Sequence, residues 1–243
     1  MKDLLQKYNV PVPRYTSYPT VPFWGENTIE SERWINHLKQ AFEATNHTHG
    51  ISLYLHLPFC ESLCTYCGCN KRITKNHQLE KPYVESMLKE WGNYLKHFEQ
   101  RPSIREIHLG GGTPTFFDSS NLKKLVKGVL DPSDIHQQHS FGFEGSPNNT
   151  TRDHLETLYQ LGFTRVSLGV QDFDSKVQRA VNRINTFDQV AQVVRWAREI
   201  GYDSVNLDLI YGLPFQTEDT MSKTLELTAN LPVSYTHLRA HET

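Results

Sequence analysis

Four cysteines lie within ten residues, directly after an apolar run. The spacing is Cys60-x-x-x-Cys64-x-x-Cys67-x-Cys69, and the chain contains no other cysteine. Thiolates this close in sequence can bind one soft metal centre from a single loop, and iron-sulfur clusters are held by cysteine thiolates. Three of the four could each bind one iron of a cubane and leave the fourth iron open. The spacing therefore predicts a metal-sulfur centre at the end of a strand.

Two other uses of the cysteines fit the sequence less well. Structural zinc sites usually combine two closely spaced pairs separated by a dozen or more residues, and this chain has no second pair. A disulfide framework is typical of small secreted chains, whereas this chain has 243 residues and shows no secretory signal. The spacing favours an iron-sulfur cluster over zinc, and zinc over disulfides.

The composition argues against two classes of partner. A formal net charge of −2 and a pI near 6.6 give no basic field for a nucleic-acid backbone. No apolar run reaches the length of a membrane helix. Reduced thiols in the cytosol also suit cluster assembly. We therefore expect a cytoplasmic protein with no nucleic-acid partner and no membrane association.

Strand-like and helix-like segments alternate along the chain. This alternation predicts an α/β fold of parallel βα units, in which polar side chains gather at the carboxyl ends of the strands. The expected strands are 51–57, 106–109, 140–144, 165–170 and 204–209, and the expected helices are 30–43, 83–98, 120–130, 152–161, 177–182, 187–200 and 218–229.

We divide the chain into three regions. Residues 1–48 are expected to form an extended arm, rich in Pro, Tyr and Thr, followed by a helix. Residues 49–231 are expected to form a partial parallel (β/α) barrel whose last strand is missing. Residues 232–243 break the pattern, and we expect them to be a tail of non-native origin.

The cysteine motif resembles the radical S-adenosylmethionine signature, in which an aromatic residue, here Tyr66, precedes the third cysteine. The extension Gly68-Cys69-Asn70-Lys71 and the opening segment 9–20, which contains Arg-Tyr-Thr-Ser-Tyr-Pro, are similar to the oxygen-independent coproporphyrinogen III oxidases, or coproporphyrinogen dehydrogenases. The related haem chaperones keep three cysteines but typically lack both of these features. The resemblance implies a partial barrel of the radical SAM type and, beyond it, a further carboxyl-terminal domain.

The resemblance also implies a reaction. It would be the oxygen-independent oxidative decarboxylation of coproporphyrinogen III propionates to vinyl groups, which gives protoporphyrinogen IX in haem biosynthesis. The implied cofactors are a 4Fe-4S cluster and one or two molecules of S-adenosylmethionine, the source of a 5′-deoxyadenosyl radical. An electron donor and an electron acceptor would be the other partners. Two alternatives stay open: a haem-binding chaperone of the same superfamily, and an inactive fragment that binds a cluster and little else.

The resemblance assigns roles to individual residues. Cys60, Cys64 and Cys67 would hold the cluster, whereas Cys69, one residue from Cys67, is expected to be a neighbouring thiol that binds no iron. Arg14 with Tyr15 is a candidate for contact with substrate carboxylates. The residues implied to contact S-adenosylmethionine are Tyr54, Tyr66, Gly111, Gly112, Thr113, Glu144, Gln171, Arg183 and Asp208.

Each of these assignments competes with a simpler interpretation. The glycine run could be a plain turn between a strand and a helix, and Tyr54 could be a buried structural tyrosine. The polar residues near strand ends could be ordinary solvated positions. We expect His56 and His108 to be structural. Glu144 is followed by Gly145-Ser146-Pro147, where the family more often has an apolar residue and Asp before the proline.

Overall fold

The computed structural model describes residues 30–240, and the chain divides into two compact units, Met1–Leu38 and Lys39–Thr243. Nearly all of the described structure belongs to the second unit. Helix α2 (Ser31–Thr45) precedes the sheet, and its buried Phe42 stacks on Phe98 with ring centroids 3.9 Å apart. The expected amino-terminal arm, with Arg14 and Tyr15, lies outside the described residues.

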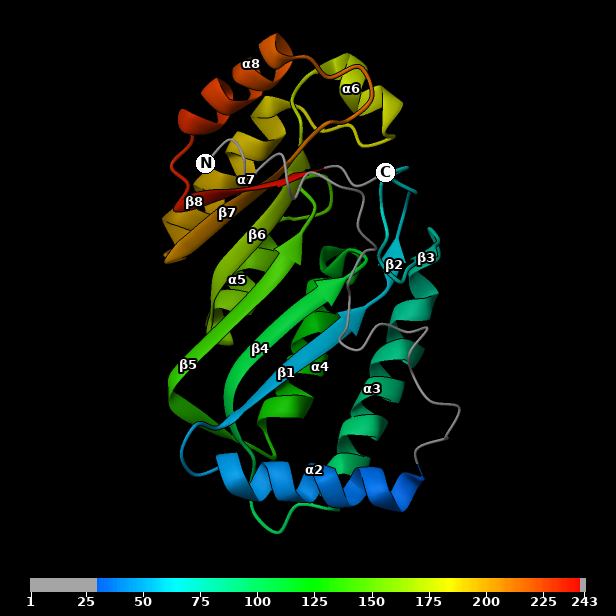
Figure 1. Ribbon diagram of the computed structural model, residues 1–243. Helices are drawn as coiled ribbons and strands as arrows, with labels where there is room; N and C mark the ends of the chain where they lie inside the picture. Colours follow the sequence, from blue (N-terminus) through cyan, green and yellow to red (C-terminus); the bar gives the residue numbers. More distant parts are fainter. Residues whose placement is uncertain (1–29, 241–243) are drawn as a thin grey trace, which may run out of the picture. The chain divides into compact units, whose positions relative to one another are not determined.

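A single sheet of six parallel strands forms the centre of the second unit (Figure 1). The parallel α/β arrangement predicted from the sequence is confirmed. A separate two-stranded pair, β2 (Phe59–Cys60) and β3 (Arg72–Ile73), carries the first cysteine. The strands of the main sheet, in spatial order, are β1 (Ile51–Leu57), β4 (Ser103–Gly111), β5 (Asp134–Gly145), β6 (Phe163–Gln171), β7 (Ser204–Tyr211) and β8 (Tyr235–Ala240).

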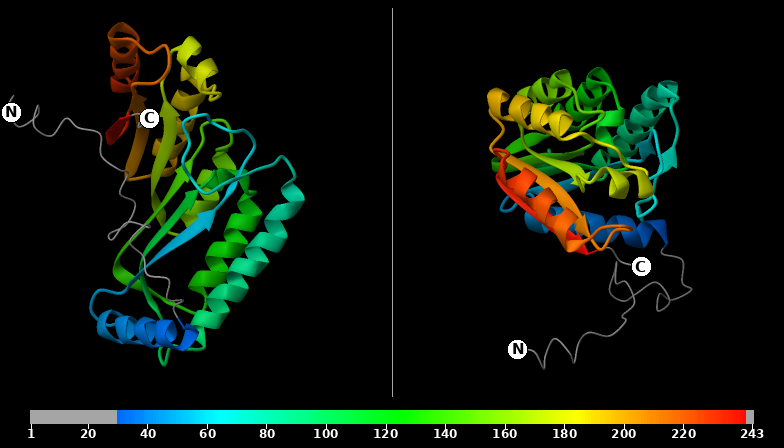
Figure 2. Two further views of the ribbon diagram at one scale, coloured as in Figure 1. Left: turned by 45° about the vertical axis from the view of Figure 1, so that its right-hand side comes forward. Right: turned by 90° about the horizontal axis from the view of Figure 1, so that it is seen from above.

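Four helices cover one face of this sheet (Figures 1 and 2). They contact one another in the order in which they follow their strands. Within the described residues, no helix is both long and apolar enough to cross a membrane. The covering helices are α3 (Glu80–Leu95), α4 (Ser119–Leu130), α5 (Arg152–Gln160) and α7 (Phe187–Ile200); the shorter η2 (His77–Leu79), η3 (Pro114–Phe116) and α6 (Ser175–Ala180), and α8 (Glu218–Ala229), complete the set.

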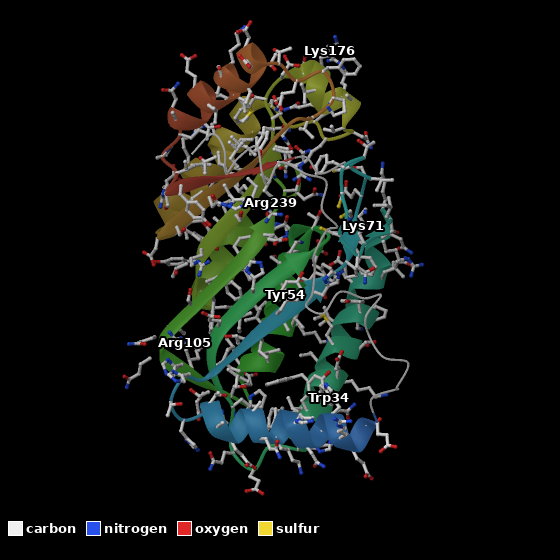
Figure 3. All side chains as sticks on the ribbon, viewed as in Figure 1. Trp34, Tyr54, Lys71, Arg105, Lys176 and Arg239 are labelled. Atoms are coloured by element: carbon white, nitrogen blue, oxygen red, sulfur yellow. The ribbon has the colours of Figure 1, made fainter. Side chains whose placement is uncertain are left out.

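Alternation along the strands separates an apolar face from a polar face. On β4, Ile107 and Leu109 are fully buried under the helices, whereas Glu106, the residue before Ile107, is exposed. On β1, Leu53 and Leu55 pack against the same core, and Tyr54 projects from the opposite face with 57% of its surface exposed (Figure 3). Because side chains alternate with a period of two, the polar residues share one face of the sheet.

The sixth strand differs from expectation. The alternation of apolar segments predicts five strands and a missing last strand, but β8 pairs in parallel with β7, with Tyr235 opposite Asn206 and Ala240 opposite Tyr211. The expectation of a missing strand is therefore wrong for the described residues. The apolar pattern could not find β8, because all its residues are exposed except the partly buried Thr236.

A buried carboxylate ties the start of α3 to the start of α4. Glu80 is fully buried, and its Oε1 lies 2.6 Å from Nδ1 of His77. Its Oε2 accepts hydrogen bonds from the backbone N–H of Asp118 (2.7 Å) and from Nδ2 of Asn121 (2.8 Å). The ring of His77 stacks on Phe116, with centroids 4.4 Å apart. Glu80 therefore joins the segment that follows the cysteines to the segment that follows the glycine run.

We expect Glu80→Ala to lower the free energy of unfolding by about 2–3 kcal/mol, because the substitution removes a fully buried carboxylate that accepts hydrogen bonds from the backbone N–H of Asp118 and the side-chain amide of Asn121. Urea titration measures this change. The matched control is Glu85→Ala on the same helix, which removes only an exposed ion pair with Lys124 and should cost under about 1 kcal/mol. Equal losses in the two variants would contradict the structural role given to Glu80.

The His77–Glu80 pair should also make stability depend on pH. The hydrogen bond to Glu80 raises the pKa of His77 above its ordinary value. A raised pKa in the folded state means that the stabilisation is complete below about pH 6.5, the unfolded value, and is lost as pH rises through the folded value. The stability difference between the wild type and His77→Gln should therefore shrink as urea titrations move from pH 6 toward pH 9. A difference that grows with pH would contradict this.

Candidate functional site

The cysteine loop leaves the sheet directly after β1 and is closed by the small β2–β3 pair. The backbone N–H of Arg72 donates to the carbonyl of Pro58 (2.8 Å), and that of Thr74 donates to the carbonyl of Cys60 (2.9 Å). All four cysteines are free thiols; the first three are partly buried and Cys69 is exposed. The backbone therefore holds both ends of the loop at the carboxyl end of the sheet.

The far side of the same loop is anchored on α6 and the residues after it. The backbone N–H of Thr65 donates to the carbonyl of Val181 (3.1 Å), and Nδ2 of Asn182 donates to the carbonyl of Leu63 (2.8 Å). Tyr66 packs against a small apolar cluster that includes Val181. These contacts fix the loop against a helix more than a hundred residues later in the sequence.

Polar groups from two other segments reach the first two cysteines. Oγ1 of Thr113 lies 3.3 Å from Sγ of Cys60, and Nη1 of Arg183 donates to Sγ of Cys64 at 3.7 Å. Burial raises the pKa of the Cys60 thiol, the Thr113 hydrogen bond lowers it, and negative charge on Cys67 and Cys64 raises it again. The three thiols therefore influence one another electrostatically, as donors to a shared centre must.

A zinc site and a four-iron cluster require different separations of their thiolates. Zinc at about 2.3 Å from each sulfur would bring its thiolates to about 3.8 Å from one another. In a four-iron cluster each thiolate binds a different iron, so the sulfurs stay farther apart. Across residues 30–240, no group of three cysteine sulfurs lies within 4.8 Å; the one such group of ligand-type atoms is formed by His77, Glu80 and Asp118.

The thiol of Cys69 affects the pKa of the neighbouring Cys67. A hydrogen bond from the Cys69 thiol, together with the ammonium of Lys71 and against the effect of burial, lowers the pKa of Cys67 to about 5, whereas the same bond raises the pKa of Cys69. Nζ of Lys71 donates to the carbonyls of Cys67 (2.8 Å) and Cys69 (3.3 Å). Cys67 is thus prepared to be a thiolate, the form that binds iron.

The glycine run lies directly beside the cysteine loop. The backbone N–H of Gly112 donates to the carbonyl of Leu57 (2.8 Å), and that of Thr113 donates to the carbonyl of Phe59 (3.0 Å). A Cβ on Gly112 would lie 2.6 Å from the carbonyl oxygen of Pro58, which is backbone and has no room to move. Glycine is therefore required here for two backbone segments to approach closely, and the run is more than a plain turn.

Side chains of β1, β4 and β5 form a connected group on the polar face of the sheet. The ring of Tyr54 stacks on His108 (centroids 5.9 Å apart), and its hydroxyl lies 3.2 Å from Nδ1 of His56. Oε1 of Glu144 lies 3.3 Å from Nε2 of His108, and its Oε2 accepts from the backbone N–H of Gly111 (3.4 Å). The interpretation of Tyr54 as a buried tyrosine is therefore wrong, and the two histidines link residues that the sequence analysis had singled out.

A second group forms where β6 ends. A Cβ on Gly169 would lie 3.0 Å from Nε2 of Gln171 and 2.8 Å from Nη2 of Arg183, so both side chains meet above this glycine. Nε and Nη2 of Arg183 both donate to the carbonyl of Gly169, at 3.0 and 2.5 Å. Asp208 pairs with Gly169 in the β6–β7 register, and its Oδ2 accepts from the hydroxyl of Ser167 (2.8 Å).

The structure therefore brings most of the candidate residues to one end of the sheet, in two groups that flank the cysteine loop.

Two details differ from the positions expected from the sequence. Asp208 lies within β7 rather than at its end, and Arg183 follows α6 rather than a strand. Sequence reasoning missed Ser167, and also Asn206, whose Nδ2 donates to Oδ1 of Asp208 (3.0 Å). Their only sequence signal is a polar residue at an alternating position of a strand.

Known proteins share both the sequence and the fold. Residues 54–228 match the family model described as the Radical SAM superfamily. The oxygen-independent coproporphyrinogen III oxidase of Pseudomonas aeruginosa is 39% identical over 226 residues, which are 92% of this chain and 48% of that protein. The protein of the same name from Escherichia coli is 38% identical over 94% of this chain.

A solved structure agrees with these sequence matches. The coproporphyrinogen III oxidase of Escherichia coli, described as a radical SAM enzyme, superposes with a TM-score of 0.86 at 33% identity, over 98% of this chain and 52% of that one. This chain spans about half the length of the curated relatives it matches. From its family match, its fold and its cysteine loop, the chain belongs to the Radical SAM superfamily.

Proposed function

We propose that Cys60, Cys64 and Cys67 hold a 4Fe-4S cluster whose fourth iron binds S-adenosylmethionine. The observation that carries this proposal is the placement of three electrostatically coupled thiols on one loop, between the glycine run and Arg183. The lowered pKa of Cys67 fits a thiolate ligand of such a cluster. When bound, the cluster would supply the electron that cleaves S-adenosylmethionine into methionine and a 5′-deoxyadenosyl radical.

Residues of the two polar groups would bind the amino acid and ribose parts of S-adenosylmethionine. Arg183 has a planar fork that matches a carboxylate, and it lies beside Cys64. Gly111, Gly112 and Glu144 offer backbone and carboxylate groups next to the cysteine loop, where the amino acid part would lie. Gln171 and Asp208 would bind the ribose hydroxyls, and the aromatic rings of Tyr54 and Tyr66 would pack against the rest of the cofactor.

For the whole protein we propose oxygen-independent oxidation of coproporphyrinogen III to protoporphyrinogen IX, as a cytoplasmic oxidoreductase of haem biosynthesis. Support comes from relatives that carry this name at 36–39% identity along nearly all of this chain. Coproporphyrinogen III would be the substrate, with an electron donor and an electron acceptor as partners. No contact in the described residues favours a haem chaperone.

The cluster assignment predicts different outcomes for neighbouring cysteines. After anaerobic reconstitution, the wild type should hold about four iron atoms per chain, and Cys64→Ser should lose most of them because one thiolate is absent. Cys69→Ser, two residues from a ligand, should keep its iron. Iron and sulfide analysis with spin resonance of the reduced sample measures both. Stoichiometric zinc without iron, or equal iron loss in the two variants, would contradict the assignment.

The reaction assignment is tested with the full-length protein. Anaerobic incubation with S-adenosylmethionine, a reductant, a one-electron acceptor and coproporphyrinogen III should give 5′-deoxyadenosine, carbon dioxide and a vinyl-containing porphyrinogen, read by chromatography and mass spectrometry. Arg183→Lys should raise the KM for S-adenosylmethionine roughly tenfold or more, because a lysine loses the paired donors of the fork. Deoxyadenosine without a vinyl product would retain the cofactor assignment and overturn the substrate assignment. Stable haem binding without decarboxylation would favour the chaperone.

A further inference from the structure

A strained turn lies at the end of β6, inside the proposed cofactor site. Gln171 has a φ of 75°, in the left-handed region that a residue with a side chain rarely adopts. The backbone N–H of Asp172 donates to the carbonyl of Val170 (3.0 Å), which closes a three-residue γ-turn with Gln171 at its centre. A γ-turn with positive φ at its centre is rare and strained. The β6–β7 register also shifts between Gly169 and Gln171.

The next residue, Asp172, is buried, and both oxygens of its carboxylate accept hydrogen bonds. Only 1% of its surface is exposed. Its Oδ1 accepts from the backbone N–H of Asp174 (2.6 Å) and from the hydroxyl of Thr224 on α8 (2.9 Å), and its Oδ2 accepts from Nε2 of Gln216. Gln216 belongs to the loop after β7. One carboxylate thus connects the end of β6, the loop after β7 and α8.

The backbone on either side of Asp172 is held as well. Its carbonyl accepts from Nε2 of Gln178 (2.8 Å), and the same Nε2 also donates to the carbonyl of Asn185 (2.8 Å). The backbone N–H of Arg183 donates to the carbonyl of Gln178 (2.9 Å). The network therefore extends from the γ-turn to the segment that carries Arg183, the proposed partner of the cofactor carboxylate.

Strained backbone persists only where the surrounding structure over-determines it, and such strain concentrates at functional sites. Here the strain has a geometric result, because it directs the side chain of Gln171 over Gly169, next to Arg183. We infer that Asp172 is a positioning residue for S-adenosylmethionine, which acts through the strained turn at Gln171. This inference rests on the proposed function, since it assigns the support of the same cofactor site.

The test compares Asp172→Asn with Asp188→Asn, which makes the same change at an exposed position in the first turn of α7. Each variant is reconstituted anaerobically, and iron content is measured first. The affinity for S-adenosylmethionine then follows from the change that the cofactor causes in the spin resonance of the reduced cluster. Asp172→Asn should keep its iron and bind S-adenosylmethionine roughly tenfold more weakly, since an amide replaces one acceptor with a donor facing Asp174 or Gln216. Asp188→Asn should match the wild type.

A double-mutant cycle separates positioning from general support of the fold. If Asp172 acts through Gln171, Asp172→Asn should cost little further affinity once Gln171→Ala has removed the positioned side chain. A purely structural role would give the same loss in both backgrounds, and that result overturns the inference, as does an unchanged affinity in Asp172→Asn alone. A wild type that loads its cluster but shows no response to S-adenosylmethionine overturns the proposed function and this inference with it.

Discussion

The parallel register of the sheet determines which residues meet at the site. Leu57 lies opposite Gly111, Glu144 lies opposite Ser167, and Asp208 lies opposite Gly169. Because every strand of this sheet runs in the same direction, all their carboxyl ends share one edge, and the polar residues there converge although they are separated by up to about 150 positions in the sequence. A one-residue slip of any strand would turn its polar side chains into the apolar core.

Close backbone approach is the second condition of the site. At Gly112 the glycine run touches the backbone of Pro58, and at Gly169 the space that a Cβ would need is filled by Gln171 and Arg183. In both places the absence of a side chain lets a functional group lie where it does. Local strain at Gln171 has the same effect by another route, since it turns a side chain toward a place that regular strand geometry would not reach.

Sequence periodicity predicted the parts of the molecule that are governed by burial. The bounds of α8 and the start of β1 follow from it, because apolar residues must alternate or recur at helical spacing to reach a core. Periodicity could not predict β8, which buries almost nothing, or the turn at Gln171, which depends on contacts with α8 and the loop after β7. The contacts of His108 with Tyr54 and with Glu144 could not be predicted either, because they join three strands that are far apart in the sequence.

The polar face of the sheet has a consequence for molecular selectivity. Tyr54, His108, Glu144 and Asp208 present hydroxyl, imidazole and carboxylate groups on this face. An apolar ligand would displace water from these groups without forming new hydrogen bonds. The desolvation of each group would weaken binding by on the order of 1–3 kcal/mol. On this argument, dehydration disfavours the binding of apolar molecules to the face, and ligands with oxygen and nitrogen atoms at their edges lose less.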